Sequence, residues 1–203
     1  MDLFASENNS NKIDLQLPNA DVSYFPNFIP SEVASEYFEV LKTETPWQQD
    51  NIKLFGKTYQ QPRLTALYGN NEKPYTYSGI TMFPKPFSKT LLQIKHKVEE
   101  KCSAKFTSVL LNLYRDGNDS NGWHSDDEKE LGPNPFIASL SLGTTRKFQL
   151  KHKQDKGLRF NILLEHGSLL IMKGETQKYW QHQIPKSKKI EKARINLTFR
   201  KIN

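Results

Sequence analysis

The sequence predicts one α+β domain in which a double-layered β structure packs against helices. Helical apolar spacing appears in two segments, 31–45 and 86–102. After residue 105 the chain consists mainly of short β-rich segments separated by turn residues. With 203 residues, of which 36% are hydrophobic and 25% charged, the chain is long enough to bury a single core.

Each predicted helix carries an apolar stripe. In SEVASEYFEVLKTET (31–45), Ser31 suits the N-cap position. The stripe of this helix is Val33, Tyr37, Phe38 and Leu41. In PFSKTLLQIKHKVEEKC (86–102), Pro86 stands near the start. The stripe of this second helix is Leu91, Leu92, Ile94 and Val98.

The remaining segments complete the expected layout. Strands are predicted at 105–114, 134–143, 146–152, 159–165, 167–173 and 193–200. Residues 47–85 are rich in aromatic side chains and broken by Pro and Gly, which is typical of hairpins and loops. We expect Tyr59 and Phe83 in the core, whereas Phe55 precedes Gly56 at an apparent turn tip. Residues 1–20 lack periodicity and are expected to form a flexible acidic leader.

Composition also narrows the class of protein. No apolar run approaches the roughly 20 residues of a membrane helix, so no membrane partner is expected. The N-terminus lacks the basic and apolar regions of a secretion signal. The lone Cys102 excludes an internal disulfide and a cysteine-based zinc site. It fits a reducing compartment, which we expect to be the cytoplasm or the nucleus.

The net charge of +7 is unevenly distributed. Residues 1–50 hold nine acidic and two basic side chains, a net −7, which leaves +14 on residues 51–203. Such a basic module suggests an anionic partner, most often a nucleic acid. The segment RKFQLKHKQDKGLR (146–159) is interpreted as a phosphate-contacting hairpin. The alternative is a solvated, lysine-rich surface.

A metal site is indicated by one pair of residues and a distant histidine. In NGWHSDDEKE, His124 and Asp126 are two positions apart, so on an extended segment they project to one face. His182 in KYWQHQIP completes two imidazoles and one carboxylate, the ligand set of non-haem Fe(II) oxygenases. A structural zinc would need four protein ligands that fill its coordination sphere. The other histidines with no ligand type at i+2 are expected at the surface or in turns: His96, His152 and His166.

The last predicted strand alternates without a break. Its apolar side is expected to pack on the helices, and carries Ala193, Ile195, Leu197 and Phe199. Its polar side carries Arg194, Asn196, Thr198 and Arg200. The two arginines lie about 20 Å apart along the strand and could bracket a small dicarboxylate. The alternative is an edge strand with a solvated polar face. Asn112 and Tyr114 share one face of strand 105–114 and are expected to point into the same interior.

The combination of H-x-D, a distal His and R-x-N-x-T-x-x-R resembles the AlkB family of Fe(II)/2-oxoglutarate dioxygenases, which repair alkylated nucleobases. The similarity runs from about residue 45 to the C-terminus. It includes LFGK, QPRLTALYG, YTYSG, LNLYRDGNDSNGWHSDDEKELG, IASLSLG, RKFQLKHK, HGSLLIM and ARINLTFRKI. These stretches are most similar to the eukaryotic-type branch that acts on DNA.

The resemblance implies a fold and cofactors. It implies a double-stranded β-helix (jelly-roll) core at 105–203, supporting N-terminal helices and a β-hairpin nucleotide-recognition lid at 45–85, all within one catalytic domain, 1–203. His124, Asp126 and His182 would bind Fe(II). The residues implied to hold 2-oxoglutarate are Asn112, Tyr114, Arg194, Asn196, Thr198 and Arg200. Arg194 would contact the distal carboxylate, and O2 would be the second co-substrate.

The resemblance also implies substrate contacts. Asp127 would contact the damaged base, with Glu128 beside it. Tyr77 would stack on the flipped base, and Tyr75 lies nearby. Phe55 matches a finger residue that enters the duplex. Arg63 would belong to the same lid, or alternatively form a structural ion pair.

The implied function is oxidative demethylation of bases such as 1-methyladenine and 3-methylcytosine, with release of formaldehyde, succinate and CO2. The partner would be single- or double-stranded alkylated DNA, and we expect the protein to be a monomer. Three alternatives remain open. The same chemistry could act on methylated RNA or on a protein side chain, or the chain could be a non-catalytic nucleic-acid-binding module.

Overall fold

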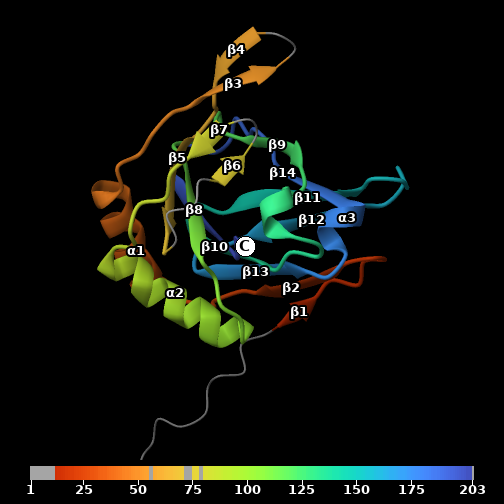
Figure 1. Ribbon diagram of the computed structural model, residues 1–203, viewed down its shortest axis with the longest axis horizontal. Coiled ribbons are helices and arrows are strands. Elements are labelled where there is room, and N and C mark those ends of the chain that lie inside the picture. Colours follow the sequence, from red (N-terminus) through yellow and green to blue (C-terminus); the bar gives the residue numbers. More distant parts are fainter. Residues whose placement is uncertain (1–11, 55–56, 71–74, 78–79, 203) are drawn as a thin grey trace, which may run out of the picture.

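The computed structural model describes residues 12–54, 57–70, 75–77 and 80–202 (Figure 1). The helical elements are α1 (Ser31–Glu44), α2 (Lys89–Cys102), the 3-10 turn η1 (Lys129–Leu131) and α3 (Thr176–Tyr179). The first seven strands are β1 (Ile13–Asp14), β2 (Asp21–Phe25), β3 (Asn51–Leu54), β4 (Lys57–Gln60), β5 (Leu64–Gly69), β6 (Tyr75–Tyr77) and β7 (Ile80–Met82). The remaining strands are β8 (Ser108–Tyr114), β9 (Asn121–His124), β10 (Ile137–Gly143), β11 (Arg146–His152), β12 (Arg159–Leu164), β13 (Ser168–Lys173), β14 (Trp180–Ile184) and β15 (Arg194–Arg200).

Two antiparallel sheets form the body of the molecule. The larger has the strand order β1-β2-β13-β10-β15-β8-β5, and the smaller has the order β12-β11-β14-β9. From β8 onward, the strands are divided equally between the two sheets: β8, β10, β13 and β15 belong to the larger one, and β9, β11, β12 and β14 to the smaller one. The predicted α+β class is confirmed.

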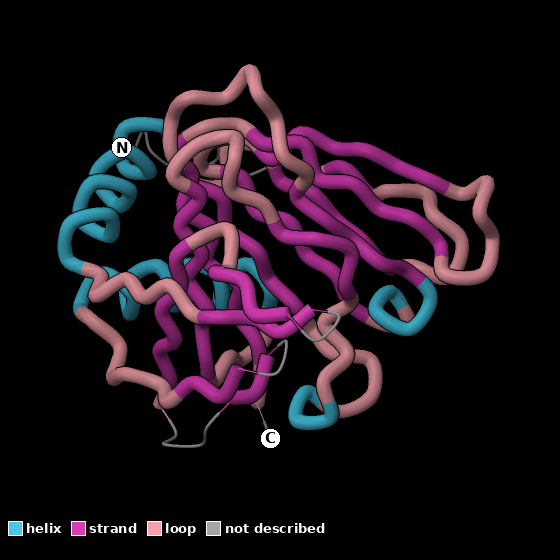
Figure 2. Tube along the Cα trace, turned by 90° about the horizontal axis from the view of Figure 1, so that it is seen from above, coloured by secondary structure: helices cyan, strands magenta, loops and turns pink. Residues whose placement is uncertain are grey.

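The layers are held together by two hydrophobic clusters. One lies between the larger sheet and the helices, where Leu91 and Ile94 of α2 join Leu111 of β8. The other lies between the sheets, where Leu110 of β8 joins Phe148 and Leu150 of β11. Viewed from above, the two long helices lie together on one side of the strands (Figure 2). The smaller sheet therefore covers the face of the larger one that the helices leave open.

Strand β15 lies in the interior of the larger sheet, between β10 and β8. Asn196 pairs with Ser141 of β10 and with Asn112 of β8, which sets the register of the three strands. Its apolar side chains Ile195, Leu197 and Phe199 belong to the cluster beneath the helices, as predicted. The alternative of a solvated edge strand is wrong.

The starts of the two long helices differ from the prediction in opposite directions: α1 includes Ser31, which was expected at its N-cap, and α2 begins three residues after position 86. Pro30, not Ser31, occupies the N-cap of α1 and makes no side-chain capping bond. Helix α2 starts at Lys89, because the hydroxyl of Ser88 accepts from the backbone N–H of Leu91. Leu92 was expected in the buried stripe but is 41% exposed.

Part of the expected leader is packed onto the protein. Strand β1 pairs with β2, and Leu15 is buried. The carbonyl of Pro18 accepts a hydrogen bond from the indole Nε1 of Trp180, at 2.9 Å. Residues 12–20 thus belong to the body of the molecule, and residues 1–11 lie outside the described part of the chain.

The region 45–85 contains two hairpins, β3–β4 and β6–β7, and one strand of the larger sheet. The β3–β4 hairpin projects at the top of Figure 1. Strand β5 pairs with β8, so it ties this region to the core. The expectation that Tyr59 and Phe83 are core residues is wrong: they are 49% and 73% exposed.

Among the described residues, no helix combines the length and the apolar character needed to cross a membrane.

Candidate active site

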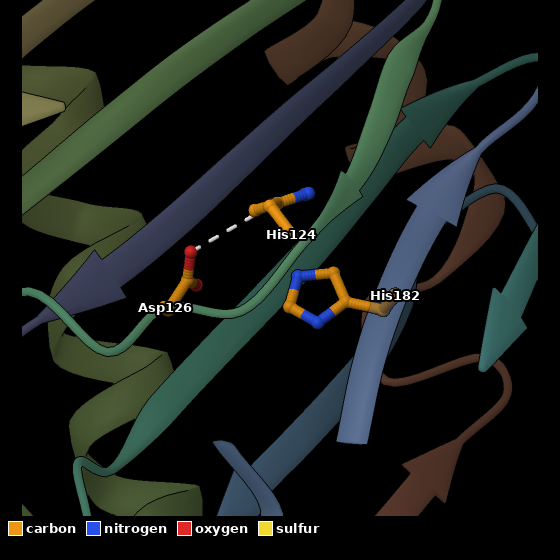
Figure 3. A group of neighbouring side chains, drawn as sticks. All are labelled: His124, Asp126 and His182. Atoms are coloured by element: carbon orange, nitrogen blue, oxygen red, sulfur yellow. Dashed lines mark ion pairs between the residues drawn. The ribbon is translucent and has the colours of Figure 1, made fainter. Parts of the chain in front are cut away.

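Three side chains converge between neighbouring strands of the smaller sheet. His124 ends β9, Asp126 follows it by two residues, and His182 lies on β14 directly opposite His124 (Figure 3). Their candidate ligand atoms all lie within 4.8 Å of one another. The two imidazole rings are 4.2 Å apart between centroids, and His124 Nε2 lies 3.8 Å from Asp126 Oδ1. The three predicted metal ligands are therefore brought together.

The histidines are held in the form that binds a metal. Nδ1 of His124 lies 2.8 Å from the carbonyl oxygen of Gly122, which assigns the proton to Nδ1 and makes Nε2 the acceptor. Nε2 lies 3.2 Å from Asn121 Nδ2, and a metal bound at Nε2 would replace this amide contact. Burial and the adjacent His124 lower the pKa of His182 to about 3. Burial also lowers the pKa of His124. Both rings are consequently neutral at physiological pH.

Asp126 supplies the anionic ligand. Burial opposes its ionisation, but Arg200 and the two histidines outweigh burial and lower its pKa to about 2. Arg200 Nη2 lies 2.9 Å from Asp126 Oδ2. Oδ1 is buried and accepts no hydrogen bond from the described residues. Two neutral imidazoles and a carboxylate with one uncommitted oxygen fit the facial ligand set of Fe(II).

A pocket lined by these ligands also receives the polar face of β15. Its walls include all six residues that the sequence associates with 2-oxoglutarate: Asn112, Tyr114, Arg194, Asn196, Thr198 and Arg200. The inner hydrogen bonds run along β15. Thr198 Oγ1 donates to Asn196 Oδ1, and Asn196 Nδ2 donates to Ser139 Oγ on β10.

Arg194 places a buried positive charge in the pocket, and no carboxylate of the described residues pairs with it. Its side chain is 1% exposed, and Nη2 donates to Ser141 Oγ at 2.9 Å. Nε and Nη1 have no hydrogen-bond partner among the described residues. Burial lowers the pKa of Arg194 to about 10, so the group stays charged at neutral pH. A buried, partly unsatisfied guanidinium is costly unless a ligand supplies the missing acceptors. This end of the pocket therefore suits a carboxylate.

Several supporting residues were not predicted from the sequence. Gln177 of α3 accepts a hydrogen bond from the backbone N–H of Asp126 through Oε1, at 2.9 Å. Phe148 stacks on the ring of His182, with centroids 5.1 Å apart. Ser139 and Ser141 alternate with apolar residues in the predicted strand 134–143, a pattern that could have identified them. No comparable signal marks Gln177.

The predicted substrate residues have different surroundings. Arg63 is buried; its Nε donates to Asn112 Oδ1 at 2.8 Å and its Nη1 donates to the carbonyl of Ser120. Asp127 is exposed and pairs with Lys153, and Glu128 is half-buried. Tyr75 and Tyr77 lie on β6, opposite Met82 and Ile80, and their side chains lie outside the described part of the structure. Phe55 also lies outside the described residues.

His152 and Arg146 are more buried than the sequence predicts. His152 was expected at the surface or in a turn, but it is buried, and its Nδ1 accepts from the backbone N–H groups of Gln154 and Asp155. Arg146, the first residue of the predicted phosphate-contacting hairpin, is 1% exposed. Its guanidinium donates to the carbonyls of Asp116, Asp119 and Pro185. Arg146 is thus a structural residue.

Comparison with known families agrees with this geometry. A family model described as the 2OG-Fe(II) oxygenase superfamily matches residues 21–200. The chain belongs to this superfamily, whose metal and co-substrate, Fe(II) and 2-oxoglutarate, suit the donor set and the arginine-lined pocket described above.

Within the superfamily, the similar proteins are AlkB homologues, so the family suggested by the sequence motifs is confirmed. "Alpha-ketoglutarate-dependent dioxygenase alkB homolog 3" of Bos taurus is 48% identical over 87% of this chain and 64% of its own length. "DNA oxidative demethylase ALKBH2" of Homo sapiens is 40% identical over 90% of this chain and 73% of its own length. The chain therefore spans slightly less than two thirds of the first of these relatives.

A solved structure, "The structure of OsALKBH1", has a similar fold. It superimposes with a TM-score of 0.64 over 92% of this chain and 99% of the solved chain. The sequence identity is 16%, so this match concerns the fold.

Proposed function

We propose that this protein is an Fe(II)/2-oxoglutarate-dependent dioxygenase that demethylates N-alkylated bases in nucleic acid, with DNA as its main substrate. The observation that carries the proposal is the shared pocket. It holds a complete metal-ligand set at one end and the partly unsatisfied guanidinium of Arg194 at the other. A non-catalytic module would have no need to keep both features intact.

The residues predicted to bind metal and co-substrate each have a role in this proposal. His124, Asp126 and His182 hold Fe(II), and Arg194 binds the distal carboxylate of 2-oxoglutarate. Arg200 keeps Asp126 ionised and oriented from the metal end. The remaining co-substrate contacts come from Asn112, Tyr114, Asn196 and Thr198. When bound, Fe(II) with 2-oxoglutarate and O2 supplies the oxidation that removes the methyl group as formaldehyde, while 2-oxoglutarate becomes succinate and CO2.

The base has to leave the duplex, or come from a single strand, to reach a buried metal. We assign Tyr75 and Tyr77 to stacking on the extruded base, Phe55 to filling the vacated stack, and Asp127 and Glu128 to contacts with the base. The hairpins β3–β4 and β6–β7 would form the nucleotide-recognition lid. Arg63 would connect this lid to the co-substrate wall, since it lies between β4 and β5 and its Nε donates to Asn112 Oδ1.

The architecture is consistent with a jelly roll in one catalytic domain. Strands β8 to β15 supply four strands to each of two facing sheets, the arrangement of a double-stranded β-helix. We further propose a monomer that acts in the cytoplasm or the nucleus. The half-buried thiol of Cys102, whose pKa burial raises to about 12, would be inert in that reducing setting.

The direct test is demethylation of one oligonucleotide that carries 1-methyladenine, assayed as a single strand and as a duplex. Formaldehyde release should require Fe(II) and 2-oxoglutarate, and His182→Ala should abolish it. Parallel assays of a methylated RNA oligonucleotide and a methylated peptide decide between the substrate classes. Full turnover by His182→Ala would contradict the iron assignment.

A further inference from the structure

The acidic run at 126–128 is compensated by basic side chains. Asp126 pairs with Arg200 at 2.9 Å, and Asp127 Oδ2 lies 3.1 Å from the Nζ atom of Lys153. Lesions such as 1-methyladenine carry a positive charge, so an uncompensated carboxylate beside the base would favour them over neutral lesions. The ammonium group of Lys153 reduces that advantage, because it lies next to the carboxylate proposed to contact the base.

Lys153 is fixed in this position by contacts that do not involve Asp127. Its backbone N–H donates to the carbonyl of Tyr179 at 2.7 Å, and its Nζ donates to the carbonyl of Gln177 at 2.8 Å. Gln177 in turn holds the backbone N–H of Asp126. The ammonium group is therefore anchored to the same short helix that positions the metal ligand.

The ion pair itself contributes little to folding. The side chain of Asp127 is 58% exposed and that of Lys153 is 29% exposed, a setting in which ion pairs add little stability. Asp127 directly follows the metal ligand Asp126, so the ion pair lies at the end of the metal-ligand segment.

We propose that Lys153 is a specificity-determining residue that acts through Asp127 and sets the preference of the site between cationic and neutral alkylated bases. This inference rests on the proposed function, since it deepens the role of the same site. Lys153 needs no contact with the base for this effect.

The test compares two lesions in the same oligonucleotide, cationic 1-methyladenine and neutral 3-methylthymine, and uses the ratio of their kcat/KM values. Lys153→Met should raise the cationic-to-neutral ratio about three- to tenfold, with a smaller rise at high salt. Lys153→Arg keeps the charge and should keep the wild-type ratio. Asp127→Asn should lower the ratio, and Lys153→Met added to Asp127→Asn should no longer raise it.

Lys178→Met is the matched control. It removes an equal charge from α3, the short helix that anchors Lys153. Lys178 pairs with Glu175, so the ratio should not change. If Lys153→Met lowers both kcat/KM values equally, Lys153 only supports Gln177 and Asp126, and the inference is wrong.

A binding measurement separates this inference from the proposed function. The affinities of wild-type protein and of each variant for the two oligonucleotides are measured by fluorescence anisotropy, without turnover. Absence of demethylation by the wild type would overturn the proposed function. An unchanged affinity ratio in Lys153→Met, together with an unchanged kcat/KM ratio, would overturn the role of Lys153 even in an active enzyme.

Discussion

Two arginines on one strand have different electrostatic partners. Arg200 pairs with the metal ligand Asp126, whereas Arg194 donates to the hydroxyl of Ser141 and has two nitrogens without acceptors in the described part of the chain. The alternation of β15 predicts that both side chains face the pocket, but it cannot distinguish their partners. That distinction depends on Asp126, which is 68 positions earlier in the chain than Arg194.

At the residue scale, Arg194→Met should raise the KM for 2-oxoglutarate at least about 30-fold, because losing one partner of a buried charge pair costs about 2 kcal/mol or more. Steady-state kinetics with saturating oligonucleotide measure this change. Arg194→Lys should give an intermediate KM, since it keeps the charge without the planar fork. An unchanged KM in Arg194→Met would show that the distal carboxylate binds elsewhere.

A second residue-scale prediction concerns Glu99 of α2, which is 4% exposed. Burial opposes its ionisation, but hydrogen bonds from Lys95, the backbone N–H of Phe106 and Lys105 outweigh burial and lower its pKa below 4.5. Glu99→Gln should lower the free energy of unfolding by about 1.5–3 kcal/mol near neutral pH.

The pH dependence has a defined sign. Since the pKa of Glu99 is lower in the folded state than in the unfolded state, its contribution is complete above pH 4.5 and disappears as the pH falls through the folded pKa. The difference in unfolding free energy between wild type and Glu99→Gln, measured with urea, should therefore shrink in acid. A difference that grows in acid would contradict the assignment.

At the element scale, the two long helices begin in different ways. Helix α2 has a side-chain cap from Ser88, whereas α1 follows Pro30 and has none. Ser88→Ala should cost about 1 kcal/mol in unfolding free energy, because the N–H of Leu91 loses its acceptor. Ser31→Ala is the matched control at the start of α1 and should be nearly neutral. Equal losses in the two variants would show that the cap of α2 contributes nothing.

The positions of helices and strands were predictable where the apolar residues of a segment follow a single regular spacing. Strand β11 has the predicted bounds, 146–152, and β15 differs from its prediction by one residue. The errors occur where local pattern does not determine burial. Phe83 and Tyr59 are aromatic and were expected to be buried, yet they lie in a region of two-stranded hairpins that provide too little sheet to cover them.

At the scale of the whole molecule, the charge of the exposed hairpin formed by β11 and β12 should control affinity for nucleic acid. Lys156 and Arg159 are exposed on this hairpin, on the smaller sheet, whereas α2 covers the larger sheet. The double variant Lys156→Gln/Arg159→Gln should reduce the slope of log affinity against log salt by about 1.4–1.8.

The matched control for this measurement is Lys97→Gln. Lys97 is an exposed cation on α2 and should leave the slope unchanged. Anisotropy titrations between low and physiological salt measure all three slopes. If the double variant and Lys97→Gln behave alike, the hairpin makes no phosphate contacts.

The sequence predicts those site residues that belong to the metal-ligand motif or to the alternating polar face of β15. His124, Asp126 and His182 share one ligand set, and Asn196 shares one strand face with Arg194. Supporting contacts were not predictable, because they join segments distant in sequence. Gln177 reaches Asp126 across 51 positions, and Arg63 reaches Asn112 across 49. No local pattern indicates such pairs before the fold is known.

The central position of β15 has a consequence for how this chain can change in evolution. A substitution on the strand alters one contact, but an inserted or deleted residue would shift its pairing by one and exchange its two faces. Arginines would then enter the packed layer beneath the helices, while Ile195 and Leu197 would replace the polar wall of the pocket. Neighbouring strands on both sides leave no edge at which a bulge could absorb the shift. We therefore expect relatives to differ in the residues of this strand but not in its length.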